Sequence, residues 1–229
     1  EVVRPKGKPP RVEFKVFEPK MEKDVPQGTV TRGNASCPCC NMVLPVERVR
    51  AQLAEQHGGA DAVFDANGNR TSGAQMLAVV TLHPGMQGRN YRLPADRDYQ
   101  AVWKAQKRLK VILDEWELGG KRDPCPVPNE PLPKEREKGN SGFRVLLYGI
   151  SNFGDLFSAR QKVALSVLGK KVKSRSGSFM RDALGLVVSR LSDYGSAQTT
   201  WVPSGEFIRG TFGRQALPIV WDFSEPVPW

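Results

Sequence analysis

Apolar and polar residues alternate near the amino terminus in a way that predicts short β-strands. Val12, Phe14 and Val16 are separated by charged residues, which is the pattern of a half-buried strand. A second β-prone run covers residues 29–31. We expect the two runs to form a small hairpin module at the start of the chain.

The central part of the chain predicts two helices and one strand. Apolar residues at helical spacing follow Pro45, and the His-Gly-Gly sequence at residues 57–59 is a typical helix end. Residues 61–73 are polar and glycine-rich and predict a loop, whereas the apolar run at residues 76–80 predicts a buried strand. The longest helix is expected between residues 94 and 119, where the apolar positions form one stripe.

The second half of the chain begins after a segment that is rich in proline. Residues 119–142 contain closely spaced prolines and charges, so neither helix nor sheet should persist there. Residues 143–148 are mostly apolar and predict a strand. Ser158 and Gln161 have the spacing of a capping box, which predicts that a helix starts there. A further helix is expected over residues 179–194, because its apolar residues share one face.

The cysteines suggest half of a metal site. Three of the four lie in the sequence Cys37-Pro38-Cys39-Cys40, and Cys125 is isolated. Cys37 and Cys40 have the spacing of a zinc knuckle, in which two thiolates on a tight turn bind one tetrahedral ion. The sequence has no second knuckle. We therefore expect these two cysteines to be zinc ligands in the intact protein, with the other two ligands supplied from outside this chain.

Together these patterns predict an α+β fold, with a small β-hairpin or zinc-ribbon-like module at the amino terminus, a helix and a strand after it, and a mainly helical second half. We divide the chain into a partial zinc-ribbon module (1–45), a mixed α/β region with the long helix (46–118), a Pro-rich linker (119–142) and a mainly helical region (143–229).

The net charge of +10 is concentrated in one window of the sequence. Residues 160–190 hold eight Lys or Arg side chains and one acid, Asp182, which favours a polyanionic partner such as DNA. The residues that we expect to contact phosphates are Arg160, Lys170, Lys171, Lys173 and Arg175. The alternative is a pair of solvated helices whose acidic complement lies elsewhere.

Two further arginines are candidates for base or phosphate contact. Arg209 and Arg214 lie among the aromatic residues Trp201, Phe207, Phe212 and Trp221, and aromatic rings can support contact with nucleic acid. The competing interpretation is that these rings pack in the core, as large aromatic side chains mostly do.

Motifs of independent catalysis are absent from the sequence. It contains no Gly-x-Ser-x-Gly elbow, no His-Glu-x-x-His helix and no phosphate-binding Gly-x-x-x-x-Gly-Lys loop. Neither His57 nor His83 lies in a recognisable acid/base setting. As metal ligands they are conceivable but have no supporting spacing, and we interpret His57 as a residue at a helix carboxyl end and His83 as a turn residue beside Pro84. Asp155 is explained as an acid that caps a helix. We therefore predict no catalytic residue in this chain.

The sequence also bears on the compartment. No stretch approaches the roughly 18 apolar residues of a membrane span, and the first residues lack the apolar region of a secretory signal. Clustered cysteines that make a poor disulfide framework favour a reducing compartment. We expect a cytoplasmic protein without a membrane partner.

Several phrases occur in a recognisable order along the chain: Gly28-Thr-Val-Thr-Arg-Gly-Asn-Ala-Ser-Cys-Pro-Cys-Cys40, Pro45-x-x-x-Val49-Arg50-Ala51, Gly88-Arg-Asn-Tyr-Arg-Leu-Pro94, Gly154-Asp-Leu-Phe-Ser-Ala-Arg-Gln161, Leu191-Ser-Asp-Tyr194 and Thr211-Phe-Gly-Arg-Gln-Ala-Leu-Pro-Ile-Val-Trp-Asp-Phe223. In this order they resemble the bacterial and archaeal adenine-specific DNA methylases that contain a zinc ribbon.

This resemblance implies that the chain is the segment between two catalytic motifs. In that family a first cysteine knuckle precedes a basic, β-prone stretch like residues 4–17, and Cys37 and Cys40 match the second knuckle. The S-adenosylmethionine loop would precede this segment, and the Asp-Pro-Pro-Tyr motif would follow it. The segment then resembles the insert that holds the target-recognition region of such enzymes, which must swing adenine out of the duplex.

The resemblance also sets the expected partners. They are double-stranded DNA and the flanking methylase segments, with zinc and S-adenosylmethionine as cofactors of the intact protein. Two other classes stay open, namely a stand-alone nucleic-acid-binding or regulatory module with a partial zinc ribbon, and a purely structural insert.

Overall fold

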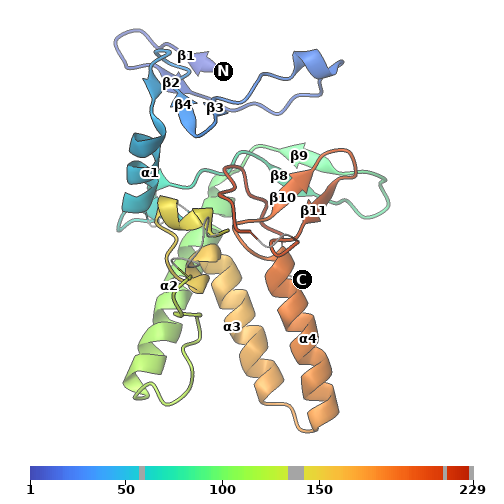
Figure 1. The fold of residues 1–229 in the computed structure, drawn as a ribbon. Coiled ribbons are helices and arrows are strands. Elements are labelled where there is room, and N and C mark those ends of the chain that lie inside the picture. The colour runs from blue at the N-terminus through green and yellow to red at the C-terminus, as the bar shows by residue number, and fades with distance from the viewer. Residues whose placement is uncertain (57–59, 134–141, 214–215, 227–229) are drawn as a thin grey trace.

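The structure is a computed structural model that describes residues 1–56, 60–133, 142–213 and 216–226. Over these residues it combines helices with several small antiparallel sheets, so the predicted α+β class is confirmed (Figure 1). The α-helices of the described part are α1 (Val46–Glu55), α2 (Asp96–Leu118), α3 (Ala159–Lys173) and α4 (Ser178–Tyr194). Short 3-10 helices are η1 (Glu22–Asp24), η3 (Arg144–Tyr148) and η4 (Phe153–Leu156).

Every sheet in the described residues is a small antiparallel unit. The pairs are β1 (Val2–Val3) with β2 (Arg11–Val12), β6 (Ala62–Phe64) with β7 (Arg70–Gly73), β8 (Val79–Thr81) with β9 (Asn90–Arg92), and β10 (Thr200–Val202) with β11 (Phe207–Arg209), and one sheet has the order β3 (Val30–Thr31), β4 (Asn34–Ser36), β5 (Val43–Leu44). Because each sheet is short, most of the buried apolar side chains come from the helices and the packed loops.

The amino-terminal strands pair differently from the prediction. The run at residues 29–31 does contain a strand, β3, but it pairs with β4, whereas β2 pairs with β1, so the two predicted runs do not form one hairpin. The strand predicted by Val12, Phe14 and Val16 is also shorter than expected and covers only Arg11–Val12. Beyond the strand, the backbone of Glu13 still exchanges hydrogen bonds with Glu1.

Of the two predictions for residues 61–80, the loop was wrong and the strand was confirmed only in part. The expected loop at residues 61–73 is the hairpin β6–β7, whose turn is held by the Asp65 carboxylate accepting the N–H groups of Asn67 and Asn69. Short polar side chains that bind their own backbone make a tight turn rather than an open loop. The expected buried strand at residues 76–80 is replaced by β8, which begins at Val79 and is paired along one edge of a two-stranded sheet.

Helices α1 and α2 are confirmed. The described part of α1 ends at Glu55 with Gln56 as its cap, and the helix end predicted at residues 57–59 lies outside the described residues. In α2 the apolar stripe turns toward the rest of the chain and Val102 is buried. Trp116 of the same helix donates its indole N–H to the Asp123 carbonyl at 2.7 Å, which holds the following loop against the helix.

An ion pair fixes the start of α2. The Asp98 carboxylate accepts two hydrogen bonds from the Arg92 guanidinium at 2.6 and 2.9 Å and one from the Ala95 N–H. These bonds, with that from Arg92 the strongest, lower the pKa of Asp98 to about 2. The carboxylate therefore stabilises the folded chain above about pH 4, and this contribution is lost as the pH falls toward 2.

The apolar core lies in the second half of the chain. Its buried residues are Leu132, Val145, Ile150, Leu156, Phe157 and Leu217. Leu132 comes from the Pro-rich segment, where its N–H donates to the Ser151 carbonyl, and Pro131 forms an isolated bridge with Asn152. Residues 119–133 have no helix or strand beyond this bridge, as predicted, yet they pack against the core. Residues 134–141 lie outside the described part.

The strand predicted at residues 143–148 is the 3-10 helix η3 instead. The Val145 N–H donates to the Leu217 carbonyl, and the Leu217 N–H donates to the Gly142 carbonyl. Among the described residues no strand is assigned beside this segment. Gly149 then ends the turn in the left-handed region, with φ of 89°. An apolar run of this length fits a buried helical turn as well as a strand, which is why the pattern alone misleads.

Candidate nucleic-acid interface

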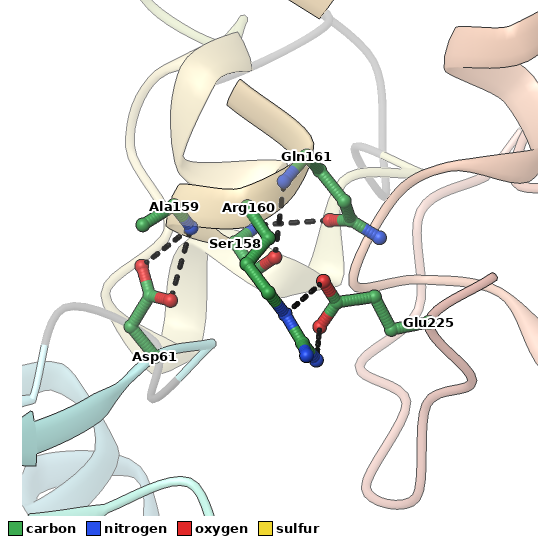
Figure 2. Close-up of polar contacts among 6 residues, drawn as sticks. All are labelled: Asp61, Ser158, Ala159, Arg160, Gln161 and Glu225. Atoms are coloured by element: carbon green, nitrogen blue, oxygen red, sulfur yellow. Dashed lines mark hydrogen bonds and ion pairs between the residues drawn. The ribbon is translucent and has the colours of Figure 1, made fainter. Parts of the chain in front are cut away.

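The predicted capping box begins α3. The Ser158 hydroxyl accepts the Gln161 N–H, and the Gln161 side chain accepts the Ser158 N–H at 2.8 Å (Figure 2). Both residues are buried, so the two bonds form out of contact with water. The helix therefore starts at a defined residue inside the protein, and its opposite end projects away from the core (Figure 1).

Asp61 adds a second contact at the same helix end. Its carboxylate oxygens lie 2.9 and 3.0 Å from the Ala159 N–H, as Figure 2 shows, and a negative charge at this position is favoured by the helix dipole. Burial nevertheless raises the pKa of Asp61. The bond joins the β6–β7 region to α3, and sequence reasoning missed it because the partners are 98 residues apart.

Arg160 is held by an acid rather than presented to solvent. Its guanidinium makes two hydrogen bonds of 2.9 Å to the Glu225 carboxylate, a paired geometry that fixes both side chains (Figure 2). Arg160 also lies in the first turn of α3, whereas the lysines predicted to act with it lie in the last turn. The structure therefore does not bring Arg160 together with the other predicted phosphate contacts.

Those other cations gather where α3 meets α4. Lys170, Lys171 and Lys173 form the last turn of α3, and Arg175 follows in the connection to α4. All four side chains are on exposed residues, and Lys173 makes an ion pair of 2.7 Å with Asp123. Cations at a helix carboxyl end are favoured by the dipole even without a ligand. Their density in one exposed turn is the feature that bears on function.

We define the hairpin tip as residues 170–181, the part of α3 and α4 farthest from the core (Figure 1). Helices α3 and α4 pack side by side, and α3 also packs against α2, so α4 has one flank open. No residue of α4 is buried. Arg181 extends the cationic surface onto α4, and the tip contains five Lys or Arg residues and no acid.

The second predicted group of arginines is only partly described. Arg209 is exposed at the end of β11, and Arg214 lies outside the described residues. Of the surrounding rings, Trp201 is half-buried and lies beneath the Arg89 guanidinium, 5.8 Å from it, whereas Phe207 is exposed. The remaining rings differ in packing: Trp221 is exposed yet meets Tyr148 edge to face, and Phe212 is exposed. The rings are therefore not one buried cluster.

The cysteine turn has the local features of a metal knuckle. Backbone N–H groups of Cys40 and Cys39 point at the Cys37 thiol and lower its pKa, which favours the thiolate that binds metals. The turn closes through the Asn41 N–H, which donates to the Cys37 carbonyl, and Asn41 adopts the left-handed region with φ of 59°. Arg4 donates to the Cys39 carbonyl at 3.1 Å, which brings the β1–β2 hairpin to this turn.

A complete metal site is not present in the part of the chain that the structure describes. No group of three or more His, Cys, Asp or Glu side chains lies within reach of a common ion there. All four cysteines are free thiols, and Cys125 does not join the turn at residues 37–40. Within the described residues, the side chains of Cys39 and Cys40 lie near the Cys37 thiol.

Among the helices described here, none combines the length and the apolar character that a membrane crossing requires. Comparisons with protein-family models, with curated proteins and with solved structures find no match to this chain.

Proposed function

We propose that this chain is the DNA-contacting segment of an S-adenosylmethionine-dependent adenine-specific DNA methyltransferase, and that its hairpin tip binds the phosphate backbone of the target duplex. The methyl donor and the catalytic motif belong to flanking segments of the enzyme, so the chain has no catalysis of its own. The observation that supports this most is the concentration of cations in the exposed hairpin tip.

Exposed cations that outnumber their acidic neighbours, here Asp123 and Asp182, suit a phosphate backbone for an electrostatic reason. Each phosphate that a protein neutralises releases condensed counterions, so affinity falls with salt in proportion to the number of contacts. Lys170, Lys171 and Arg175 have the exposure that such contacts need, and Lys173 can join them by leaving its exposed pair with Asp123, since exposed ion pairs are worth little. Arg160 is left out of this set because Glu225 occupies its guanidinium.

A salt titration tests the proposal. The full chain should bind a mixed-sequence DNA duplex at low salt, and affinity should fall steeply as salt rises. In the triple variant Lys170→Ala/Lys171→Ala/Arg175→Ala we expect the affinity at low salt to fall about thirtyfold and the slope of log K against log salt to decrease by about 2 to 3. Fluorescence anisotropy of a labelled duplex at several salt concentrations measures both quantities.

The matched control removes the same charge elsewhere. Lys6, Lys8 and Lys20 are exposed and lie in the amino-terminal region, so Lys6→Ala/Lys8→Ala/Lys20→Ala should keep most of the wild-type affinity. Equal losses in the two triple variants would show that only net charge matters. Absence of wild-type binding at low salt would overturn the proposed function itself.

We also propose that Cys37 and Cys40 bind zinc in the intact protein, with two further ligands from an upstream knuckle. Zinc would join the two knuckles and so hold the amino-terminal hairpins in place, as structural zinc does elsewhere. The thiolate-favouring N–H groups around Cys37 support this assignment.

Cadmium tests the half-site, because its bonds to thiolates absorb in the ultraviolet. The full chain should bind Cd²⁺ with a thiolate absorption band, and Cys37→Ser should weaken binding at least about tenfold, since one of two ligands is lost. Cys125→Ser is the control and should leave the band unchanged. A band that disappears in Cys125→Ser and persists in Cys37→Ser would contradict the assignment.

A purely structural insert is the second candidate, because the open flank of α4 carries exposed apolar side chains that another segment of the enzyme could cover. A stand-alone nucleic-acid-binding module with a partial zinc ribbon is the third class. The salt titration separates the structural candidate from both DNA-binding ones. For any of them we place the protein in the cytoplasm, where free cysteines and chromosomal DNA occur together.

A further inference from the structure

The hairpin tip carries large apolar side chains as well as cations. Phe179 is 83% exposed and Met180 is 53% exposed, and both lie in the first turn of α4. The turn before them contains Gly177 with φ of 92°, which lets the chain reverse direction sharply and leaves the two side chains at the extremity of the hairpin. An exposed apolar pair at the border of a charged surface can mark a binding site.

The surroundings of Phe179 indicate the chemistry of that partner. Lys171, Lys173, Arg175 and Arg181 lie in the hairpin tip, where cations outnumber acids. The acids at its border are Asp182, which follows Arg181, and Asp123, which pairs with Lys173. A second copy of this chain is a poor partner, because two cationic tips would repel each other. A nucleic-acid duplex offers both kinds of contact. Its phosphates are anionic and lie on the outside, and its stacked bases form flat apolar layers on the inside.

The start of α4 strengthens this match. Gly177 is its cap, and among the described residues no side chain accepts the first N–H groups of the helix. These groups, which lie beside Phe179, are suited to a phosphate oxygen, and the helix dipole favours an anion there. Cations, helix N–H groups without a side-chain cap and an exposed apolar pair therefore occur together in the hairpin tip.

We propose that Phe179, with Met180 beside it, is a wedge that inserts between base pairs of the bound duplex while the flanking cations hold the phosphates. This inference rests on the proposed DNA contact and adds how the duplex is deformed. Apolar wedges of this kind partly unstack a base step and kink the helix. In an enzyme that must extrude an adenine, such unstacking lowers the cost of moving the base out of the duplex.

Unwinding of a plasmid tests the wedge without knowledge of the target sequence. A nicked plasmid is saturated with the full chain, sealed with ligase and freed of protein, and its linking number is measured on a gel. Insertion between base pairs unwinds the duplex, so wild-type protein should leave negative supercoils. The double variant Phe179→Ala/Met180→Ala should reduce the linking-number change at least about fivefold at equal occupancy, while the slope of affinity against salt stays at the wild-type value.

A matched variant lies on the same helix. Leu186 and Val187 are 75% and 55% exposed, close to the values for the tip pair, but they lie two turns farther from the hairpin tip. Leu186→Ala/Val187→Ala should therefore unwind the plasmid as the wild type does. Phe179→Leu should also keep most of the unwinding, because leucine serves as a wedge elsewhere.

The outcomes separate the wedge from the DNA contact. If the wild-type chain binds DNA with a steep salt dependence but does not unwind the plasmid, or if both double variants lose unwinding equally, the wedge is wrong and the proposed DNA contact stands. If the wild-type chain does not bind DNA, both the wedge and the proposed DNA contact are wrong. If the tip pair is instead required for binding to anionic phospholipid vesicles, with no unwinding of plasmid, the surface belongs to a membrane and the wedge is overturned.

Discussion

Leu156→Ala is expected to lower the free energy of unfolding by about 3–5 kcal/mol, the upper range for removing a leucine from a packed core. The side chain is 0% exposed and lies at the centre of the core that also contains Val145 and Leu217. A loss of this size is a large fraction of the roughly 5–15 kcal/mol that stabilises a typical domain. Urea unfolding followed by circular dichroism should show a much lower midpoint or an unfolded chain.

Leu118 provides the control for this prediction. It ends α2 with 89% of its surface exposed, so Leu118→Ala removes the same atoms without opening a cavity. We expect its unfolding free energy to stay within about 0.5 kcal/mol of the wild type. Equal midpoints for the two variants would mean that Leu156 is not packed as described.

Gly149→Ala is expected to cost about 2–4 kcal/mol, although it adds only one methyl group. Gly149 has φ of 89°, a region that residues with a side chain rarely adopt, and an added Cβ would lie 2.6 Å from the Cα of Ala54. The obstacle is backbone, so α1 would have to move away from η3. Because these two elements are in contact, the substitution should separate α1 from the core.

A glycine in an open position gives the opposite result. Gly185 lies inside α4 and an added Cβ would meet nothing within 4 Å. Gly185→Ala should therefore stabilise the chain by about 0.5–1 kcal/mol, since alanine loses less conformational freedom in a helix. Denaturant unfolding of both variants measures the two shifts, and a loss of stability in Gly185→Ala would contradict the open space around the Gly185 Cα.

Sequence patterns correctly predicted the features that depend on residues close together in the chain. The capping box at Ser158 and Gln161 was confirmed because both partners lie within one turn of the helix that they start. Helices α2 and α4 were expected for the same reason, since their apolar stripes repeat over many turns. The hairpin β6–β7 was missed even though its turn contains Asn67-Gly68, a dipeptide that often signals a hairpin.

Other features depend on residues that are far apart in the chain. Arg160 was expected at a phosphate, and its partner Glu225 is 65 residues away, so no pattern near Arg160 could reveal the ion pair. The same is true of Asp61 at the start of α3. The apolar run at residues 143–148 was assigned to a strand because period alone does not separate a short strand from a buried turn. The cationic hairpin tip was predicted as a group of charges, but its exposed apolar pair was not.

The base of α3 has a mechanical consequence for the tip. A helix of 15 residues is roughly 22 Å long, so a tilt of about 5° where it is anchored would move its far end by roughly 2 Å. The bonds of Asp61 and Glu225 to the first turn act against such a tilt. If the hairpin tip binds DNA as proposed, side chains that do not touch the duplex would thus set where the far end of α3 meets it, and changing them would misplace the contact without altering the charge of the tip.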